Sequence, residues 1–366
     1  MTNKSLFPAL ACAVLFSCSK QTDTGLKLAA SDAQGPASSY TVSTFAGSGI
    51  AGSVDGTGTA ASFTHPMGLA IDSSGNLYVA DVQSAKIRKI TPDGVVTTLA
   101  GNGQRGSVNG PDTVAEFYDP VRLAIDTAGN VYVTDARFNN RIRKITPAGV
   151  VTTFAGGGGA GTVNGVDTAA KFDDPIGITV NVNGNIYVSD GFEPEIRQLT
   201  PQAVVTTFAG SRIQGSADGT GTAAGFFTPD GMCRDGYGNI YLADVNNQKI
   251  RKITPAALVT TIAGTGAFGS ADGPGATASF NEPCDVAIDG LGYLYVCDAA
   301  NNTIRRISPS DTVTTIAGIA GQQGSANGPG SASTFYMPSG VVVDRSGNIY
   351  VADASNNIIR KLTPNN

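Results

Sequence analysis

Three charged residues stand out in this 366-residue chain because they replace residues that its internal repeats otherwise keep. Arg122 and Asp285 occupy a position that is glycine in four other copies of a repeated segment, and Asp230 lies one residue before that position in a further copy. Charged side chains of this kind that converge on a cleft are typical of binding sites. We therefore expect Arg122, Asp230 and Asp285 to contact a ligand. The alternative is that they are solvated rim charges or an ion pair that stabilises the fold.

The two carboxylates also suggest metal chemistry. Asp230 and Asp285 would supply the oxygen ligands that Ca²⁺ prefers, but the sequence identifies no third ligand. His65 is the only histidine, so a zinc site with several histidines cannot form within this chain. We expect no resident cofactor, and a divalent cation such as Ca²⁺ is the alternative.

A repeat positions these residues. The tetrapeptide Tyr-hydrophobic-small-Asp occurs six times, and its aspartates are 54 or 55 residues apart: Asp81, Asp135, Asp190, Asp244, Asp298 and Asp353. A proline precedes each aspartate by 15 residues and a phenylalanine precedes it by 18. A fixed period of this size indicates a repeat architecture. Most conspicuous residues here therefore recur for structural reasons.

Each repeat contains four short strand-like runs. In the first repeat they cover residues 68–71, 76–80, 87–90 and 95–99, and turn-forming residues separate them. Six such units predict an all-β, six-bladed β-propeller with four antiparallel strands per blade. The last repeat lacks its fourth strand, whereas residues 42–47 have the form of that strand. We expect the N-terminal strand to complete the last blade, because that pairing removes an exposed sheet edge.

The blade pattern resembles NHL repeats. In the first unit it reads Pro66-Met67-Gly68-Leu69-Ala70-Ile71-Asp72, then Ile87-Arg88-Lys89-Ile90-Thr91-Pro92. The resemblance extends from about residue 41 to the end and implies the propeller fold. Such propellers serve as protein-binding platforms, ligand binders and enzymes alike, so the function stays open. Similarity to lactonase-like propellers implies a divalent ion at the channel mouth, whereas the single histidine disfavours NHL-type amidating lyases.

Two further motifs indicate structure rather than chemistry. Gly47-Ser48-Gly49-Ile50-Ala51-Gly52 has the form of a dinucleotide-binding motif, but no helix follows it. Asp-Gly or Asn-Gly pairs such as Asp55-Gly56 recur between the blades and are typical of turns, with a Ca²⁺ site as the alternative. We expect the aspartate that ends each tetrapeptide to fix a turn by side-chain-to-backbone hydrogen bonds.

The N-terminus predicts export. Residues 1–17 combine a short charged start with an apolar run that is too short to span a bilayer, which is typical of a signal peptide. The segment Leu15-Phe16-Ser17-Cys18 resembles a bacterial lipoprotein signal, which implies a lipid on Cys18; the alternative is an ordinary signal peptide cut elsewhere. We expect a flexible tether over residues 18–39 and the propeller over residues 40–366.

Two later cysteines leave a disulfide open. Cys284 and Cys297 begin and end a predicted hairpin, where they could face each other and be oxidised in an exported protein. The alternative is that both are small buried side chains without a bridge.

These observations predict a class of function. The net charge of −5 and the lack of a basic patch argue against nucleic-acid binding. We expect an exported, monomeric, non-enzymatic propeller that is anchored in the cell envelope by its lipid alone. It would present its loop-rich top face to an unidentified protein or small ligand. The alternative is a metal-dependent hydrolase or lactonase-like enzyme that acts at the mouth of the central channel.

Overall fold

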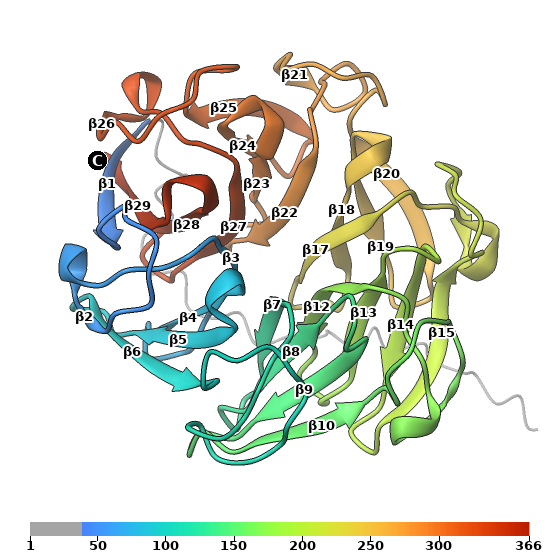
Figure 1. Cartoon of the computed structure of the whole chain (residues 1–366). Coiled ribbons are helices and arrows are strands. Elements are labelled where there is room, and N and C mark those ends of the chain that lie inside the picture. Colours follow the sequence, from blue (N-terminus) through green and yellow to red (C-terminus); the bar gives the residue numbers. More distant parts are fainter. Residues whose placement is uncertain (1–38, 366) are drawn as a thin grey trace, which may run out of the picture. The chain divides into compact units, whose positions relative to one another are not determined.

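The computed structural model describes residues 39–365, which form six antiparallel sheets around a central channel (Figure 1). The sheets are the blades of a six-bladed β-propeller, as the repeats predict. Each blade is numbered by its repeat, so blade one contains Asp81 and blade six contains Asp353. Across residues 39–365, no helix is long and apolar enough to cross a membrane.

Four strands build every blade from the channel outward. The innermost strands are β3 (Pro66–Ile71), β7 (Pro120–Ile125), β12 (Pro175–Val180), β17 (Pro229–Arg234), β22 (Pro283–Ile288) and β27 (Pro338–Val343). The second strands are β4 (Leu77–Asp81), β8 (Val131–Asp135), β13 (Ile186–Asp190), β18 (Ile240–Asp244), β23 (Leu294–Asp298) and β28 (Ile349–Asp353). The third strands are β5 (Lys86–Ile90), β9 (Arg141–Ile145), β14 (Glu195–Leu199), β19 (Lys249–Ile253), β24 (Thr303–Ile307) and β29 (Ile358–Asn365).

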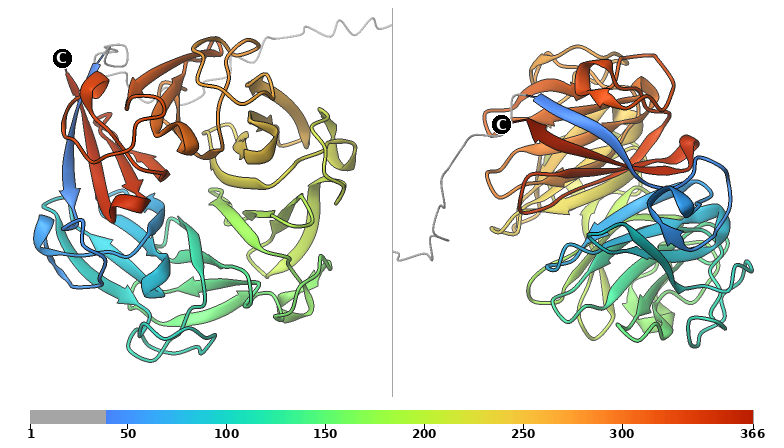
Figure 2. Two further views of the ribbon diagram at one scale, coloured as in Figure 1. Left: turned by 45° about the horizontal axis from the view of Figure 1, so that its top comes forward. Right: turned by 90° about the vertical axis from the view of Figure 1, so that its left-hand side faces the viewer.

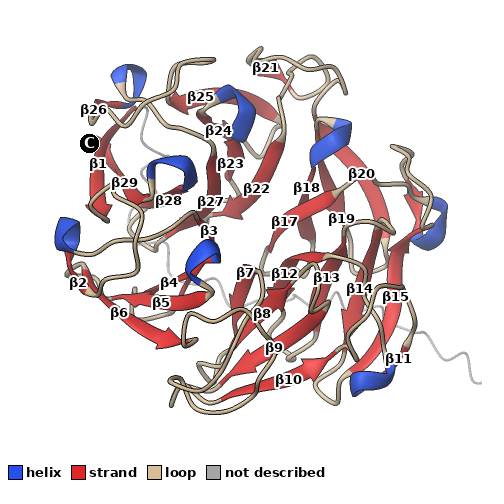
Figure 3. Ribbon diagram, viewed as in Figure 1, coloured by secondary structure: helices blue, strands red, loops and turns tan. Residues whose placement is uncertain are grey.

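The outer strands complete the sheets (Figure 3). They are β6 (Val95–Ala100), β10 (Val151–Ala155), β15 (Val204–Gly210), β20 (Leu258–Ala263), β25 (Thr312–Ala317) and, in blade six, β1 (Ser39–Ala46). All blades except blade two carry a fifth strand of two residues: β2 (Gly56–Thr57), β11 (Gly165–Val166), β16 (Gly219–Thr220), β21 (Gly273–Pro274) and β26 (Gly328–Pro329).

Short 3₁₀ turns are the helical elements of the described chain. One set lies in the connectors between blades: η1 (Gly58–Ala60), η3 (Asp167–Ala169), η4 (Gly221–Ala223) and η7 (Gly330–Ala332). The other set follows the second strand in four blades: η2 (Val82–Ser84), η5 (Val245–Asn247), η6 (Ala299–Asn301) and η8 (Ala354–Asn356). In blades four to six, an asparagine of this turn donates a hydrogen bond to a connector carbonyl. The connectors and these turns therefore share one end of the ring, which we call the top face.

The N-terminal strand closes the ring, and this confirms the prediction. Strand β1 pairs antiparallel with β29, with Thr41 opposite Thr363 and Val42 opposite Leu362 (Figure 2). Strand β3 of blade one also contacts β27 of blade six. The first and last parts of the described chain thus share one sheet.

The hydrophobic core lies between neighbouring blades. One cluster joins Tyr78 and Ile87 of blade one to Phe117 and Leu123 of blade two, and equivalent clusters recur around the ring. Each blade therefore buries its apolar faces against its neighbours, as expected for a repeat protein.

An arginine in each third strand contacts the phenylalanine and the aspartate that recur in every repeat. Arg88 is fully buried, donates a hydrogen bond of 3.1 Å to Asp81, and lies 5.2 Å from the ring centre of Phe63. The other five blades repeat this triad with Arg143, Arg197, Arg251, Arg305 and Arg360. The fixed spacing of phenylalanine and aspartate follows, because both side chains must meet the same guanidinium.

The tetrapeptide aspartates also accept a backbone hydrogen bond, but not, as the sequence predicted, from the turn that follows them. The amide of Thr64, which lies 17 residues upstream, donates to Asp81 at 2.7 Å. The Asp-Gly and Asn-Gly pairs have a further task that the sequence did not indicate. Asp55 and Asn109 accept hydrogen bonds from the guanidinium groups of Arg88 and Arg143, at 2.6 and 2.9 Å. Their oxygens thus already have a cationic partner, which leaves the Ca²⁺ alternative without support.

Candidate ligand-binding site

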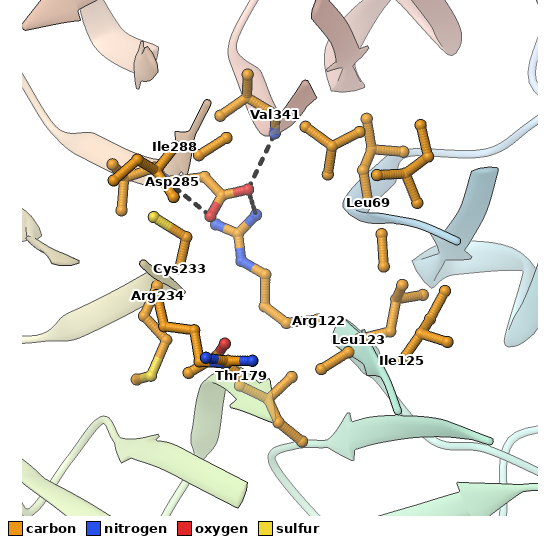
Figure 4. Close-up of a pocket in the computed structure, with 18 of the residues that line it drawn as sticks. Leu69, Arg122, Leu123, Ile125, Thr179, Cys233, Arg234, Asp285, Ile288 and Val341 are labelled. Atoms are coloured by element: carbon orange, nitrogen blue, oxygen red, sulfur yellow. Dashed lines mark hydrogen bonds and ion pairs between the residues drawn. The ribbon is translucent and has the colours of Figure 1, made fainter. Parts of the chain in front are cut away.

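The structure brings the three predicted site residues together in the central channel. Arg122 extends from blade two across the channel, and its Nε and Nη2 donate to Asp230 Oδ1 at 3.1 and 3.0 Å. Its Nη1 lies 3.2 Å from Asp285 Oδ2 (Figure 4). The Arg122 side chain is only 4% exposed. We call Arg122, Asp230 and Asp285 the channel network.

Close packing explains why this position is otherwise glycine. A Cβ at Gly68 would lie 2.5 Å from the carbonyl oxygen of Val121, and one at Gly177 would collide with the carbonyl of Asp230. The innermost strands therefore approach too closely for a side chain at most of these positions. Arg122 and Asp285 fit because their side chains extend into the channel instead.

The channel network also satisfies backbone groups at the free edges of the innermost strands. Arg122 donates to the carbonyls of Cys284, at 2.7 Å, and Ser339. Asp285 accepts from the amides of Val286 and Val341 at 3.0 and 2.9 Å. Unpaired buried backbone groups are costly, so these contacts stabilise the centre of the ring.

Burial and charge act against each other in this network. Burial raises the pKa of Asp285 to about 6, although the Arg122 guanidinium opposes the shift. Burial also raises the pKa of Asp230. For Arg122, burial disfavours the charged form, but the attraction of the Asp230 and Asp285 carboxylates outweighs this effect and raises the pKa above its usual value. Arg122 therefore stays protonated and holds the place between the carboxylates that a cation would need.

The residues present do not fit a metal ion. In the described part of the chain, no three His, Cys, Asp or Glu side chains are grouped so that they could hold one. A Ca²⁺ ion at Asp230 and Asp285 would have to displace a buried guanidinium, and a third carboxylate is not at hand. The geometry therefore gives the metal-dependent alternative no support.

A cavity of about 290 Å³ adjoins the channel network (Figure 4). Arg122 and Asp285, each the third residue of its strand, bound this cavity at one end. The walls of the cavity are formed by the fourth to sixth residues of all six innermost strands. We call this cavity the channel chamber. Its walls are mainly aliphatic, with Ile71, Leu123 and Ile288 among them.

Two polar residues of the channel chamber, Arg234 and Thr179, were not among the predicted site residues. The sequence contains a signal for Arg234 in the sixth position of the innermost strand. That position is Ile or Val in five blades: Ile71, Ile125, Val180, Ile288 and Val343. Arg234 replaces it in blade four, so Arg234 departs from the repeat in the same way as Arg122 does.

A second departure from the repeat lies on the top face of blades two and three. Neither blade has the 3₁₀ turn after its second strand, and the replacing turns expose Phe138 and Phe192 by 74% and 69%. Phe138 packs on Tyr118, with ring centres 4.8 Å apart. The two turns meet at Asp174, which accepts from the amide of Arg137 through its side chain and from that of Gly191 through its carbonyl.

Charged groups lie in and beside the two turns that carry these aromatic side chains. Arg137 Nε lies 2.8 Å from Asp119 Oδ2. Burial raises the pKa of Asp119, although Arg137 opposes the shift. His65, which is half-buried, has a pKa lowered by burial although Asp119 opposes the shift. Burial and the nearby Glu193 raise the pKa of Asp173. We call Phe138 and Phe192, with this charged border, the aromatic patch.

The cysteines of the described region carry free thiols. Cys284 Sγ lies near the carbonyl oxygens of Pro338 and Cys297, at 3.4 and 3.8 Å. Cys297 is fully buried. In the structure both residues fill space without a bridge, which is the second of the two alternatives.

One repeat of the chain matches a known sequence unit. Residues 335–362 match the NHL repeat. The matched segment runs from Phe335 through Asp353 to Arg360, so this NHL repeat contains the buried triad of blade six.

Two curated relatives share the sequence over most of the chain. Protein SUPPRESSOR OF QUENCHING 1, chloroplastic, of Arabidopsis thaliana is 32% identical over 291 residues, which cover 71% of this chain and 26% of the relative. NHL repeat-containing protein 2 of Gallus gallus is 27% identical over 342 residues, which cover 81% of this chain and 46% of the relative. This chain thus corresponds to less than half the length of either relative.

The fold also recurs among solved structures. An auxiliary nutrient binding protein from Bacteroides thetaiotaomicron VPI-5482 superposes with a TM-score of 0.68 at 19% identity, and the match covers 88% of this chain and 76% of that one. This similarity supports the propeller architecture.

Proposed function

We propose that this protein is an exported, non-enzymatic binding propeller that holds a protein ligand on its top face. The observation that carries the proposal is the aromatic patch, where two neighbouring blades give up the regular turn and expose Phe138 and Phe192. Exposed aromatic side chains with a polar border are typical of protein interfaces, where they contribute most of the binding energy.

The related proteins are in keeping with this function. A propeller of the same architecture is an auxiliary nutrient binding protein, and one of the two curated relatives is NHL repeat-containing protein 2. We propose that this chain likewise acts by binding, as a monomer.

The channel network belongs to the same proposal. We propose that Arg122, Asp230 and Asp285 contact a small ligand that enters the central channel. The proposal is supported by the position of Arg122 and Asp285 on the wall of the channel chamber.

The N-terminal segment would bring the propeller to the cell envelope. Residues 1–17, Cys18 and the tether up to residue 38 lie outside the described residues. We propose that residues 1–17 are a signal peptide, that Cys18 carries the lipid, and that the propeller of residues 40–366 stands on the periplasmic or cell-surface side of the membrane.

Membrane fractionation tests the anchor. We expect the wild-type protein to partition with membranes and to shift in size when the cells are treated with globomycin, because that compound blocks cleavage of lipoprotein signals. Cys18→Ala should release the protein or leave its precursor uncleaved. Unchanged membrane partition and unchanged size of the variant would contradict the anchor.

Affinity capture tests the top-face ligand. The tagged protein should retain a specific protein from an envelope extract of its own organism, and the Phe138→Ser/Phe192→Ser double variant should lose about tenfold of that retention, because two central anchors are gone. Phe268→Ser is the matched control, since Phe268 is 71% exposed but belongs to blade five. Equal retention by wild type and double variant would refute the proposed face, as would the absence of any specific protein.

A further inference from the structure

The channel chamber contains a guanidinium without a carboxylate partner. Arg234 Nε donates to the carbonyl of Val180 at 2.7 Å, and Nη1 donates to that of Asp235 at 3.2 Å. Among residues 39–365, no carboxylate lies within ion-pair distance of Arg234, whereas Arg122 and the six blade arginines each have one. The side chain therefore brings to the chamber a positive charge that no carboxylate contacts.

The neighbouring acid does not neutralise this charge. The carboxylate of Asp235 accepts hydrogen bonds from the amides of Tyr237 and Asn239, from the Asn239 side chain and from the Tyr241 hydroxyl. It is therefore oriented into the turn that follows β17. Burial lowers the pKa of Arg234 in spite of Asp235, in line with a charge that is poorly solvated where it lies.

A hydrogen-bonding group lies next to this guanidinium. Thr179 precedes Val180, the residue whose carbonyl Arg234 binds, and both Thr179 and Arg234 line the chamber (Figure 4). Thr179 is 8% exposed, and its hydroxyl makes no hydrogen bond to any other described residue. A free guanidinium nitrogen and a free hydroxyl thus occupy one side of the cavity.

The rest of the chamber is apolar. Ile71, Ile125, Ile288 and Val343 stand at the same strand position as Arg234 in their own blades, and Leu123 and Ile178 lie deeper. Half-burying a charge beside such walls is costly unless an ion of opposite sign compensates it. An arginine in place of the regular Ile or Val therefore calls for an anion with an apolar body.

We propose that the channel chamber binds a small organic monocarboxylate, with its carboxylate on Arg234 and Thr179 and its apolar body against the aliphatic walls. A single charge fits because the chamber has one cation without an ion-pair partner, and Asp285 at the end bounded by the channel network would repel a second carboxylate. The volume of about 290 Å³ lies at the small end of ligand sites. The inference rests on the proposal that the channel holds a ligand, and it is independent of the aromatic patch.

Calorimetric titration of the purified full-length protein tests the inference. The ligands are benzoate and 4-methylpentanoate, with benzyl alcohol as the neutral analogue and inorganic phosphate as an anion without an apolar body. We expect both carboxylates to bind, and benzyl alcohol and phosphate to bind at least about tenfold more weakly, which corresponds to about 1.4 kcal/mol.

Two variants locate the site. Arg234→Ile restores the residue type of the other five blades and should fold, yet it should weaken carboxylate binding by about tenfold or more. Arg345→Gln is the matched control, because it removes the same charge from an exposed turn beside the end of β27, outside the chamber. This control should bind as wild type does.

Three results would overturn the inference: no binding of either carboxylate at millimolar concentration, equal binding by Arg234→Ile, or equal binding of benzyl alcohol. The top-face function can be separated from each of them. If Arg234→Ile still captures the protein ligand while no carboxylate binds, only the chamber inference fails. If carboxylates bind and capture is absent, only the top-face function fails.

Discussion

The buried arginine of each blade is the residue on which the repeat depends. Its guanidinium lies 4.9 to 5.4 Å from the ring centre of a phenylalanine and within 2.6 to 3.1 Å of an aspartate. Blades one, four and five add a second carboxylate from the connector, whereas blade two has Asn109 there instead. If the tetrapeptide aspartate is replaced by a neutral residue, the buried arginine of blade four keeps one carboxylate partner, whereas that of blade two keeps none.

This difference predicts unequal costs for one substitution. Asp135→Asn leaves Arg143 buried with no carboxylate at ion-pair distance and should lower the free energy of unfolding by about 3–5 kcal/mol. Asp244→Asn leaves Arg251 with Asp218 at 2.9 Å, so it should cost about 1.5–3 kcal/mol. Chemical denaturation of both variants measures the two values. Equal costs would show that the connector carboxylate contributes nothing.

The residues of the proposed site could be predicted from the sequence only where they break the repeat. Comparing equivalent positions was enough to find Arg122, Asp230 and Asp285, but not their mutual contacts. Arg122 donates a hydrogen bond to Asp230 of blade four, on another side of the channel. No other repeat has such a pair, so the sequence contains no pattern from which this contact could be predicted. Phe138 lies in the turn after Asp135, which is one residue longer than the equivalent turn of every other blade. The extra length alone does not indicate whether a side chain is buried or exposed.

At the scale of elements, strand β1 is the one whose position the sequence predicted best. Residues 42–47 have the motif of an outer strand, and the structure pairs β1 with β29, with a start at Ser39. The pairing of Ser39, Tyr40 and Thr41 could not be predicted, because these residues lie outside the repeated motif. In the structure they lie opposite Asn365, Pro364 and Thr363 of β29.

Buried and exposed side chains alternate along β1, so substitutions at neighbouring positions should have unequal effects on stability. Val42 is 1% exposed in the core of blade six, so Val42→Asp should destabilise the ring by on the order of 3 kcal/mol, because a charge is buried without a partner. Ser43 is exposed opposite Lys361, and Ser43→Asp should change stability by no more than about 0.5 kcal/mol. Thermal unfolding compares the two variants. A mild effect of Val42→Asp would mean that β1 does not close the ring.

At the scale of the whole molecule, regular blades carry two irregular regions. The channel network and channel chamber lie on the axis, where all six innermost strands meet. The aromatic patch lies on the top face of blades two and three. The repeats predicted the ring itself, because every unit had to pack against a copy of itself. They could not predict which blades would lack the 3₁₀ turn after the second strand, because a feature that departs from the repeat does not recur at a fixed spacing.

Crosslinking in living cells tests whether blades two and three hold a protein ligand. A photo-reactive phenylalanine analogue is placed at position 138 and, in a separate variant, at position 268. We expect irradiation to join position 138 to one specific protein and to give no such adduct at position 268. Identical adducts from both positions, or none from position 138, would contradict this proposal.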